Sequence, residues 1–105
     1  MRISAIILSL ALSSLAFAAG DAAKGKESYT KKCKSCHAED GAGTPAMQKK
    51  YAEKWKALGG KEVQAMNDAA LTKAMEAVTN HKAVLKASTP EELGDVIAHI
   101  RTLKK

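Results

Sequence analysis

The chain has 105 residues and a formal net charge of +6, from 17 basic and 11 acidic side chains. That length is enough for one domain and too short for two. The excess positive charge is carried mostly by lysines that are scattered along the sequence, without an arginine-rich block or interleaved aromatic residues. A nucleic-acid-binding function is therefore not expected.

Residues 1–19 have the features of a cleavable secretory signal. Arg2 precedes a short apolar run, which ends in a group of small residues. The run is short for a bilayer span, and its end is typical of signal-peptidase cleavage. We therefore expect cleavage after Ala18 or Ala19, export to the periplasm, and a mature domain of residues 20–105.

The mature chain has helical patterns and no strand pattern. Helices are predicted over residues 22–32, 46–58, 68–78 and 90–103, with loops over residues 38–45 and 81–87. Asp21 and Asn67 or Asp68 are the expected N-caps of the first and third helices. The last helix has the clearest start, because Thr89, Pro90 and Glu92 form a capping-box pattern.

The sequence Cys33-Lys34-Ser35-Cys36-His37 carries the strongest functional signal in the chain. Its two thiols are three residues apart on one face of a helical turn, within reach of the two vinyl groups on one edge of a porphyrin. The adjacent imidazole can bind iron, and the spacing is typical of c-type haem attachment. We predict one haem c per chain, attached through Cys33 and Cys36, with His37 as an iron ligand.

Three other uses of these thiols fit the sequence less well. A thioredoxin-like dithiol, with thiol oxidoreductase activity, would need a preceding strand and a parallel sheet, and haem attachment would consume both thiols. A zinc site would need further soft ligands, and there is no third cysteine. A disulfide within so small a loop would contribute little stability.

A haem would also supply a core that this small chain lacks. A domain of this size buries little apolar surface by itself. Tyr29, Tyr51 and Trp55 are the aromatic residues left after signal cleavage. We expect Trp55 to pack against the haem or to form a hydrogen bond at its edge. The predicted fold is all-α, with four or five helices wrapped around one haem.

The mature chain resembles class I cytochromes c of the small bacterial monohaem kind over its whole length. The resemblance rests on the haem motif, on Gly25 and Tyr29 before it, on the glycine-rich loop that ends at Pro45, and on the capped final helix. It implies that the first and last helices cross closely, with Gly25 and Tyr29 against Val96 and His99. It also implies that the carbonyl of Pro45 accepts a hydrogen bond from Nδ1 of the motif histidine, which would fix that ring and make it more basic.

The sixth iron ligand departs from the family pattern. The family usually takes it from a methionine ahead of the last helix, but the corresponding position before Pro90 is His81, and no methionine follows Met75. We predict His81 as this ligand. Met75 or, less favourably, Met66 is the alternative ligand, and an open or water-filled position is the third possibility. Histidine ligation would give a lower reduction potential than thioether ligation. His99 is expected to pack at the helix crossing.

These features predict a one-electron carrier between redox proteins, not an enzyme. Lysines beside the haem motif and the sixth-ligand loop are expected to guide redox partners with acidic docking faces: Lys31, Lys32, Lys34, Lys82 and Lys86. An open sixth position would instead favour a haem-based sensor of small ligands, or a weak peroxidase with His81 as its base. A monomer without stable membrane insertion after signal cleavage is expected.

Overall fold

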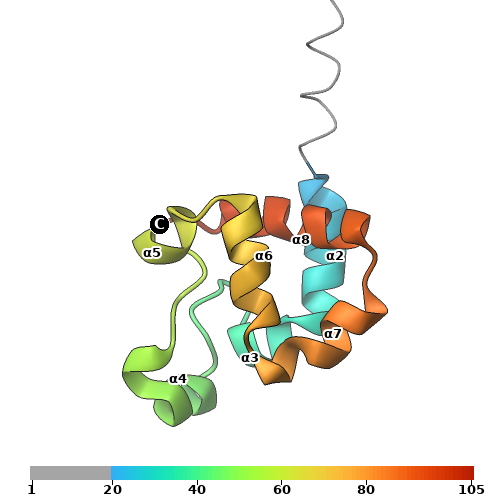
Figure 1. The fold of residues 1–105 in the computed structure, drawn as a ribbon. Helices are drawn as coiled ribbons and strands as arrows, with labels where there is room; N and C mark the ends of the chain where they lie inside the picture. Colours follow the sequence, from blue (N-terminus) through green and yellow to red (C-terminus); the bar gives the residue numbers. More distant parts are fainter. Residues whose placement is uncertain (1–19) are drawn as a thin grey trace, which may run out of the picture.

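The computed structural model describes residues 20–105. These residues form helices joined by loops, and they contain no strand. The predicted all-α fold is confirmed. The signal segment predicted over residues 1–19 lies outside the described residues. The α-helices are α2 (Ala22–Lys32), α3 (Lys34–His37), α4 (Pro45–Tyr51), α5 (Lys61–Gln64), α6 (Asp68–Glu76), α7 (Lys82–Ala87) and α8 (Pro90–Thr102), with 3₁₀ turns η2 (Ala52–Lys54) and η3 (Thr79–His81) (Figure 1).

The helix starts predicted from the sequence are confirmed by their capping hydrogen bonds. The Asp21 carboxylate accepts from backbone N–H groups of the first turn of α2, and the Asn67 side chain does the same for α6. At the start of α8 the Thr89 hydroxyl accepts from the Glu92 N–H at 3.1 Å, and the Glu92 carboxylate accepts from the Thr89 N–H at 3.0 Å. Pro90 occupies the first turn of that helix. These contacts satisfy donors that a helix leaves unpaired at its N-terminus.

Helices α2 and α8 cross in close contact, as the resemblance implied. A Cβ atom on Gly25 would lie 1.8 Å from the carbonyl oxygen of Asp95, so only glycine allows the backbones to approach this closely. One turn further on, the Tyr29 ring packs against His99 with ring centroids 5.0 Å apart. The Asp95 carboxylate accepts from the N–H of Asp21 at 2.8 Å and so ties the start of α2 to α8.

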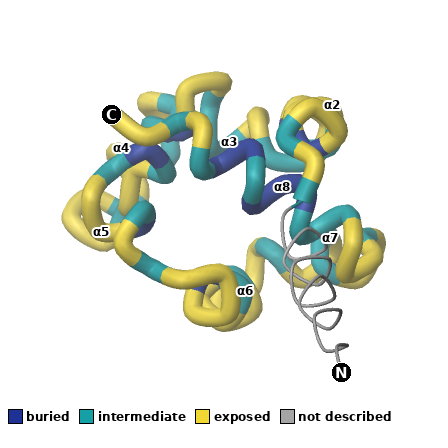
Figure 2. The backbone as a smooth tube through the Cα atoms, turned by 90° about the horizontal axis from the view of Figure 1, so that it is seen from above, coloured by how far each residue is buried: buried dark blue, intermediate teal, exposed yellow. Residues whose placement is uncertain are grey.

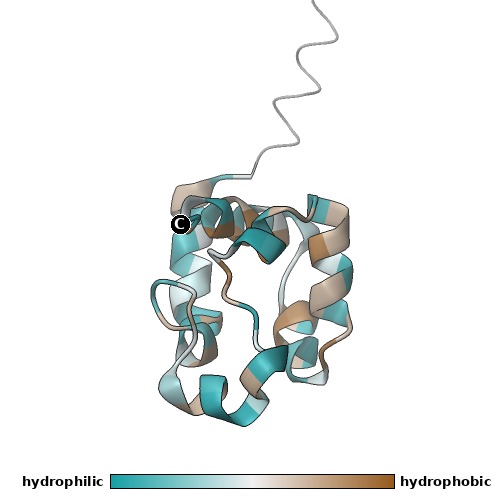
Figure 3. Ribbon diagram, turned by 90° about the vertical axis from the view of Figure 1, so that its left-hand side faces the viewer, coloured by the Kyte–Doolittle hydropathy of each residue, from teal (hydrophilic) through white to brown (hydrophobic). Residues whose placement is uncertain are grey.

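The hydrophobic core lies on the inner side of α8. Its buried members are Val63, Leu71, Val96, Ile97 and Ile100, with Cys33, Leu58 and Met66 packed around them. Seen from above, the backbone forms a ring, and α8 carries much of its buried surface (Figure 2). Hydrophilic residues are distributed over all of the helices (Figure 3). The core therefore joins α8 to Val63 of α5 and Leu71 of α6.

A polar clamp fastens the C-terminal end of α8 to the segment between α5 and α6. The Arg101 guanidinium donates to the carbonyl of Met66 and to the Asp68 carboxylate, both at 2.7 Å. The Gln64 side-chain amide donates to the carbonyl of Ile100 at 2.9 Å. The bond from Arg101 satisfies the Met66 carbonyl, and the Ile100 carbonyl accepts from Gln64 as well as from the N–H of Leu103.

Two predicted elements are wrong in their bounds. The helix expected over residues 46–58 ends at Tyr51, because Ala52 adopts a φ of 49° and the chain continues as a 3₁₀ turn. The loop expected over residues 81–87 is instead the short helix α7, whose residues Val84 and Leu85 are half-buried. The Ser88 hydroxyl donates to the carbonyl of Val84 at 2.7 Å and closes the last turn.

Within residues 20–105 no helix has the length and apolar character needed to cross a membrane.

Candidate functional site

The predicted haem motif lies at the corner between α2 and α3. Cys33 ends α2 and caps α3, and its carbonyl accepts from the N–H of His37 at 2.9 Å. Both cysteines are partly buried, and they are not joined in a disulfide. Burial raises the pKa of the Cys33 thiol above its ordinary value. The motif therefore forms the compact helical turn that the sequence predicted.

His37 is held as a neutral imidazole. Burial, and then the neighbouring His81, lower its pKa to about 4. The neutral ring is the form that binds a metal. Its Nδ1 atom is buried and has no hydrogen-bond partner, so the bond expected to the Pro45 carbonyl is not formed. Pro45 begins α4 after its N-cap Thr44, and carbonyls of a helix point along the helix axis.

His81 is positioned by a backbone carbonyl. Its Nδ1 lies 2.9 Å from the carbonyl oxygen of Met75, which can only accept, so Nδ1 donates this hydrogen bond. The same arrangement orients many metal-binding histidines. Met75 thus contributes its backbone to the site. Its side chain is partly buried, as expected for the inner face of α6.

The rings of His37 and His81 lie with centroids 6.0 Å apart and planes inclined by 28°. A metal–imidazole bond is about 2 Å long, so two such bonds in line place ring centroids roughly 6 Å apart. The separation would therefore allow His37 and His81 to hold one metal ion between them. His81 as the sixth ligand stays a prediction, and this geometry supports it.

Trp55 packs against the outer side of His37. The two rings are 5.0 Å apart between centroids and inclined by 28°. The indole Nε1 donates to the carbonyl of Ala42 at 2.8 Å. A Cβ atom on Gly43 would lie 2.3 Å from that nitrogen, so the loop needs glycine there to admit the indole. Trp55 thus supports His37, the predicted iron ligand, through a contact that the sequence did not predict.

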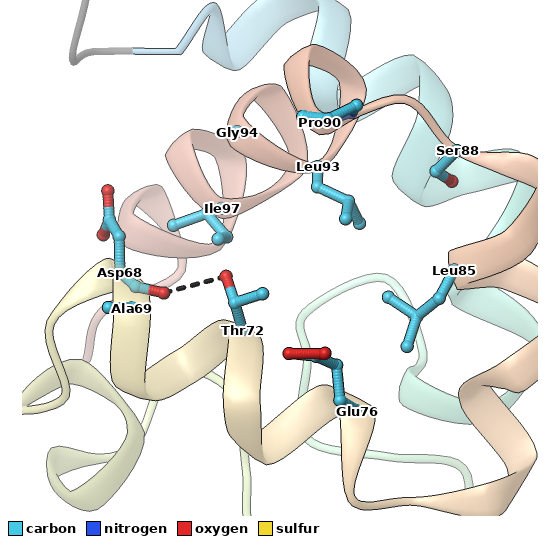
Figure 4. Close-up of a pocket in the computed structure, with 10 residues that line it drawn as sticks. All are labelled: Asp68, Ala69, Thr72, Glu76, Leu85, Ser88, Pro90, Leu93, Gly94 and Ile97. Atoms are coloured by element: carbon cyan, nitrogen blue, oxygen red, sulfur yellow. Dashed lines mark hydrogen bonds between the residues drawn. The ribbon is translucent and has the colours of Figure 1, made fainter.

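A cavity of about 550 Å³ opens between α6, α7 and α8 (Figure 4). Leu85, Leu93 and Ile97 give it an apolar wall, and Thr72 and Glu76 of α6 lie opposite. Leu85 lies in α7, four residues after His81, and His81 itself does not line the cavity. The lining of this cavity includes neither the thiols nor the imidazoles of the predicted haem site. Among residues 20–105 no three His, Cys, Asp or Glu side chains are grouped as ligands for a lone metal ion.

The all-α fold and the motif from Cys33 to His37 are typical of the class of monohaem c-type proteins. The sequence pattern of the family described as Cytochrome c matches residues 22–104. The chain belongs to the cytochrome c family, and its size and motif make it a class I member. No curated protein and no solved structure matches the chain significantly. Members of this family are generally electron carriers that hold a covalent haem c.

Sequence reasoning missed several supports of the site. Tyr51 stacks on Trp55 with centroids 5.9 Å apart, and its hydroxyl accepts from the Asn80 side chain at 2.9 Å. The Tyr29 hydroxyl donates to the carbonyl of Ala38, which directly follows the haem motif, at 2.6 Å. Tyr51 and Trp55 recur at helical spacing in the sequence, but spacing does not signal the contacts of Tyr51 with Asn80 and of Tyr29 with Ala38.

Proposed function

We propose that this protein is an exported one-electron carrier with a single haem c held by Cys33 and Cys36 and ligated by His37 and His81. The observation that carries the proposal is the pair of facing imidazoles with ring centroids 6.0 Å apart. When bound, the haem supplies reversible one-electron chemistry. The protein residues hold the ligands, exclude water and offer a surface to partners.

The supports of the two imidazoles favour a carrier. Trp55 packs against His37, and the Met75 carbonyl fixes the His81 ring. Two ligands held in place keep the iron geometry similar in both oxidation states. Because imidazole replaces the usual thioether, we expect a lower reduction potential than that of a methionine-ligated relative.

The alternative function, a small-ligand sensor or weak peroxidase, requires an open sixth position. In that case His81 would act as a base beside the iron and not as a ligand. The spacing of the two rings favours ligation, because a distal base needs room for a bound molecule between itself and the iron.

For its partners we propose redox proteins with acidic docking faces. Lys31, Lys34, Lys82 and Lys86 are exposed and suited to guide them. Lys32 is less suited than the sequence suggested, because it lies 3.8 Å from the Glu92 carboxylate and donates to the Ser88 hydroxyl at 3.3 Å. Export to the periplasm rests on the signal pattern of residues 1–19, and a monomer is the simplest assembly for a domain of this size.

The test is the absorption and low-temperature EPR spectrum of the haem-loaded wild type, His81→Ala and Met75→Leu. We expect a low-spin wild type without the far-red sulfur-to-iron band, a high-spin His81→Ala, and an unchanged Met75→Leu, which keeps the carbonyl that holds His81. A sulfur-to-iron band that disappears only in Met75→Leu would contradict ligation by His81. A high-spin wild type would favour the ligand-binding alternative.

A further inference from the structure

A column of stacked rings leads from the haem ligand His37 to the surface of the domain. Trp55 lies 5.0 Å from His37 between ring centroids, and Tyr51 lies 5.9 Å from Trp55. Successive ring planes are inclined by only 28° and 27°. The electron-carrier function requires none of these contacts, since it needs only two ligands and an attached haem.

Hydrogen bonds from two different parts of the chain hold the column in place. Trp55 donates to the Ala42 carbonyl in the glycine-rich loop at 2.8 Å. Tyr51 accepts from the Asn80 amide in η3 at 2.9 Å, directly before His81. The column is therefore anchored on the segments that carry both predicted iron ligands.

The outer end of the column is surrounded by lysines. Lys49, Lys50 and Lys54 are exposed, and Lys50 Nζ lies 5.4 Å from the centroid of the Tyr51 ring. In the described part of the chain none of the three forms a salt bridge, whereas the nearby Lys56 is paired with Glu62 at 3.0 Å. We name these three lysines and Tyr51 the α4 face. It lies at the opposite corner of the domain from α2 (Figure 1).

The α4 face combines unpaired lysines with the outer end of an aromatic column, and each of these suits a redox partner. Unpaired lysines attract and orient an acidic protein surface, and they raise its association rate. The half-buried Tyr51 then offers a ring edge at the centre of the contact, as aromatic residues commonly do at interfaces. The column continues inward to a ligand of the iron.

We propose that the α4 face docks an acidic redox protein and exchanges electrons with the haem through Tyr51, Trp55 and His37. One electron leaves the ferrous haem and one is gained by the oxidised centre of the partner, with no bond made or broken and no proton transferred. This inference rests on the proposed electron-carrier function. It adds an electron-transfer face apart from the lysines beside the haem motif.

Docking is tested first with hexacyanochromate(III), a paramagnetic trianion that is used here only to map binding. In NMR spectra of the haem-loaded protein, we expect it to broaden backbone signals of residues 49–54 most strongly. The variant Lys50→Glu/Lys54→Glu should lose this broadening. The matched control Lys24→Glu/Lys26→Glu reverses two exposed charges on α2 and should retain it. Broadening confined to the surroundings of Lys31, Lys34, Lys82 and Lys86 would overturn the proposed docking face.

Electron transfer is tested by stopped-flow oxidation of the ferrous protein with hexacyanoferrate(III). Reversing Lys50 and Lys54 should slow oxidation about tenfold at low ionic strength, compared with the control on α2. Tyr51→Leu removes the outer ring and should slow oxidation several-fold without changing the map of anion binding. Tyr51→Phe keeps the ring and should restore the rate. Equal rates for Tyr51→Leu and Tyr51→Phe would overturn the role of the column.

Different results would refute the electron-carrier function and the α4 face. A haem-loaded protein that cannot be reduced and reoxidised reversibly would refute the electron-carrier function itself. A reversible carrier whose oxidation depends on Lys34 and Lys82, and not on Lys50 and Lys54, would refute the α4 face alone.

Discussion

Replacing Gly25 by alanine tests the close crossing of α2 and α8. The new Cβ atom would lie 1.8 Å from the carbonyl oxygen of Asp95 and 2.4 Å from its carbonyl carbon. Ordinary contact begins at about 3.5 Å, so the two backbones would have to separate by roughly 1.5 Å. Such overpacking costs about 3 kcal/mol, while alanine recovers about 1 kcal/mol of helix propensity. We therefore expect Gly25→Ala to lower the free energy of unfolding by about 2 kcal/mol.

Unfolding of the haem-loaded protein by guanidinium, followed by circular dichroism, measures this loss. In a domain of this size it corresponds to a fall in Tm of about 8 to 16 °C. Gly94→Ala is the matched control, because it also lies within a crossing helix but its Cβ atom would meet nothing within 4 Å. The control should gain up to about 1 kcal/mol. A Gly25→Ala protein as stable as the wild type would refute the inferred closeness of the crossing.

Other substitutions test the supports of the site and the polar clamp. Burial raises the pKa of Tyr29 from 10.0 to about 12. The unfolded chain therefore loses this proton first, and the free energy of unfolding falls as the pH rises from 10 to about 12. Tyr29→Phe should lack this pH-dependent fall when unfolding is measured below and above that range. Ala38→Gly should add about 1 kcal/mol to the free energy of unfolding, because Ala38 has a φ of 64°; an unchanged or lower value would contradict the strain. Arg101→Gln should cost about 1 to 2 kcal/mol in the same assay, since it leaves backbone acceptors unpaired. Lys56→Gln, which breaks an exposed ion pair, should change stability by less than about 0.5 kcal/mol, and equal losses in the two variants would count against the clamp.

Local sequence signals predicted the parts of the fold that depend on local chemistry. The capping box of Thr89 and Glu92 formed as expected, because both partners lie within one helical turn. Gly25 hinted at a close crossing, since a glycine within a helical pattern is costly unless another backbone approaches it, and the family resemblance implied that the partner is the last helix. The helical turn of the haem motif also follows from its own short spacing.

Contacts between distant segments could not be predicted in this way. Nothing in the sequence near Asp95 indicates that its carboxylate binds the N–H of Asp21. The end of α4 was missed because alanine rarely adopts the positive φ found at Ala52. The contact of Trp55 with His37 was missed for a similar reason, because it depends on how the glycine-rich loop folds. These features arise when tertiary packing overrides local preference.

The uneven distribution of the core has a consequence for how the domain opens. Helix α4 and turn η2 contain no buried residue, whereas α8 contains the larger part of the hydrophobic core. Segments with few buried apolar contacts open at the lowest free energy. We therefore expect amide hydrogens of residues 45–55 to exchange by local opening while those of α8 exchange only on global unfolding. Each opening would lift Trp55 from His37, so the exposure of this imidazole to water is governed by this segment and not by the stability of the whole domain.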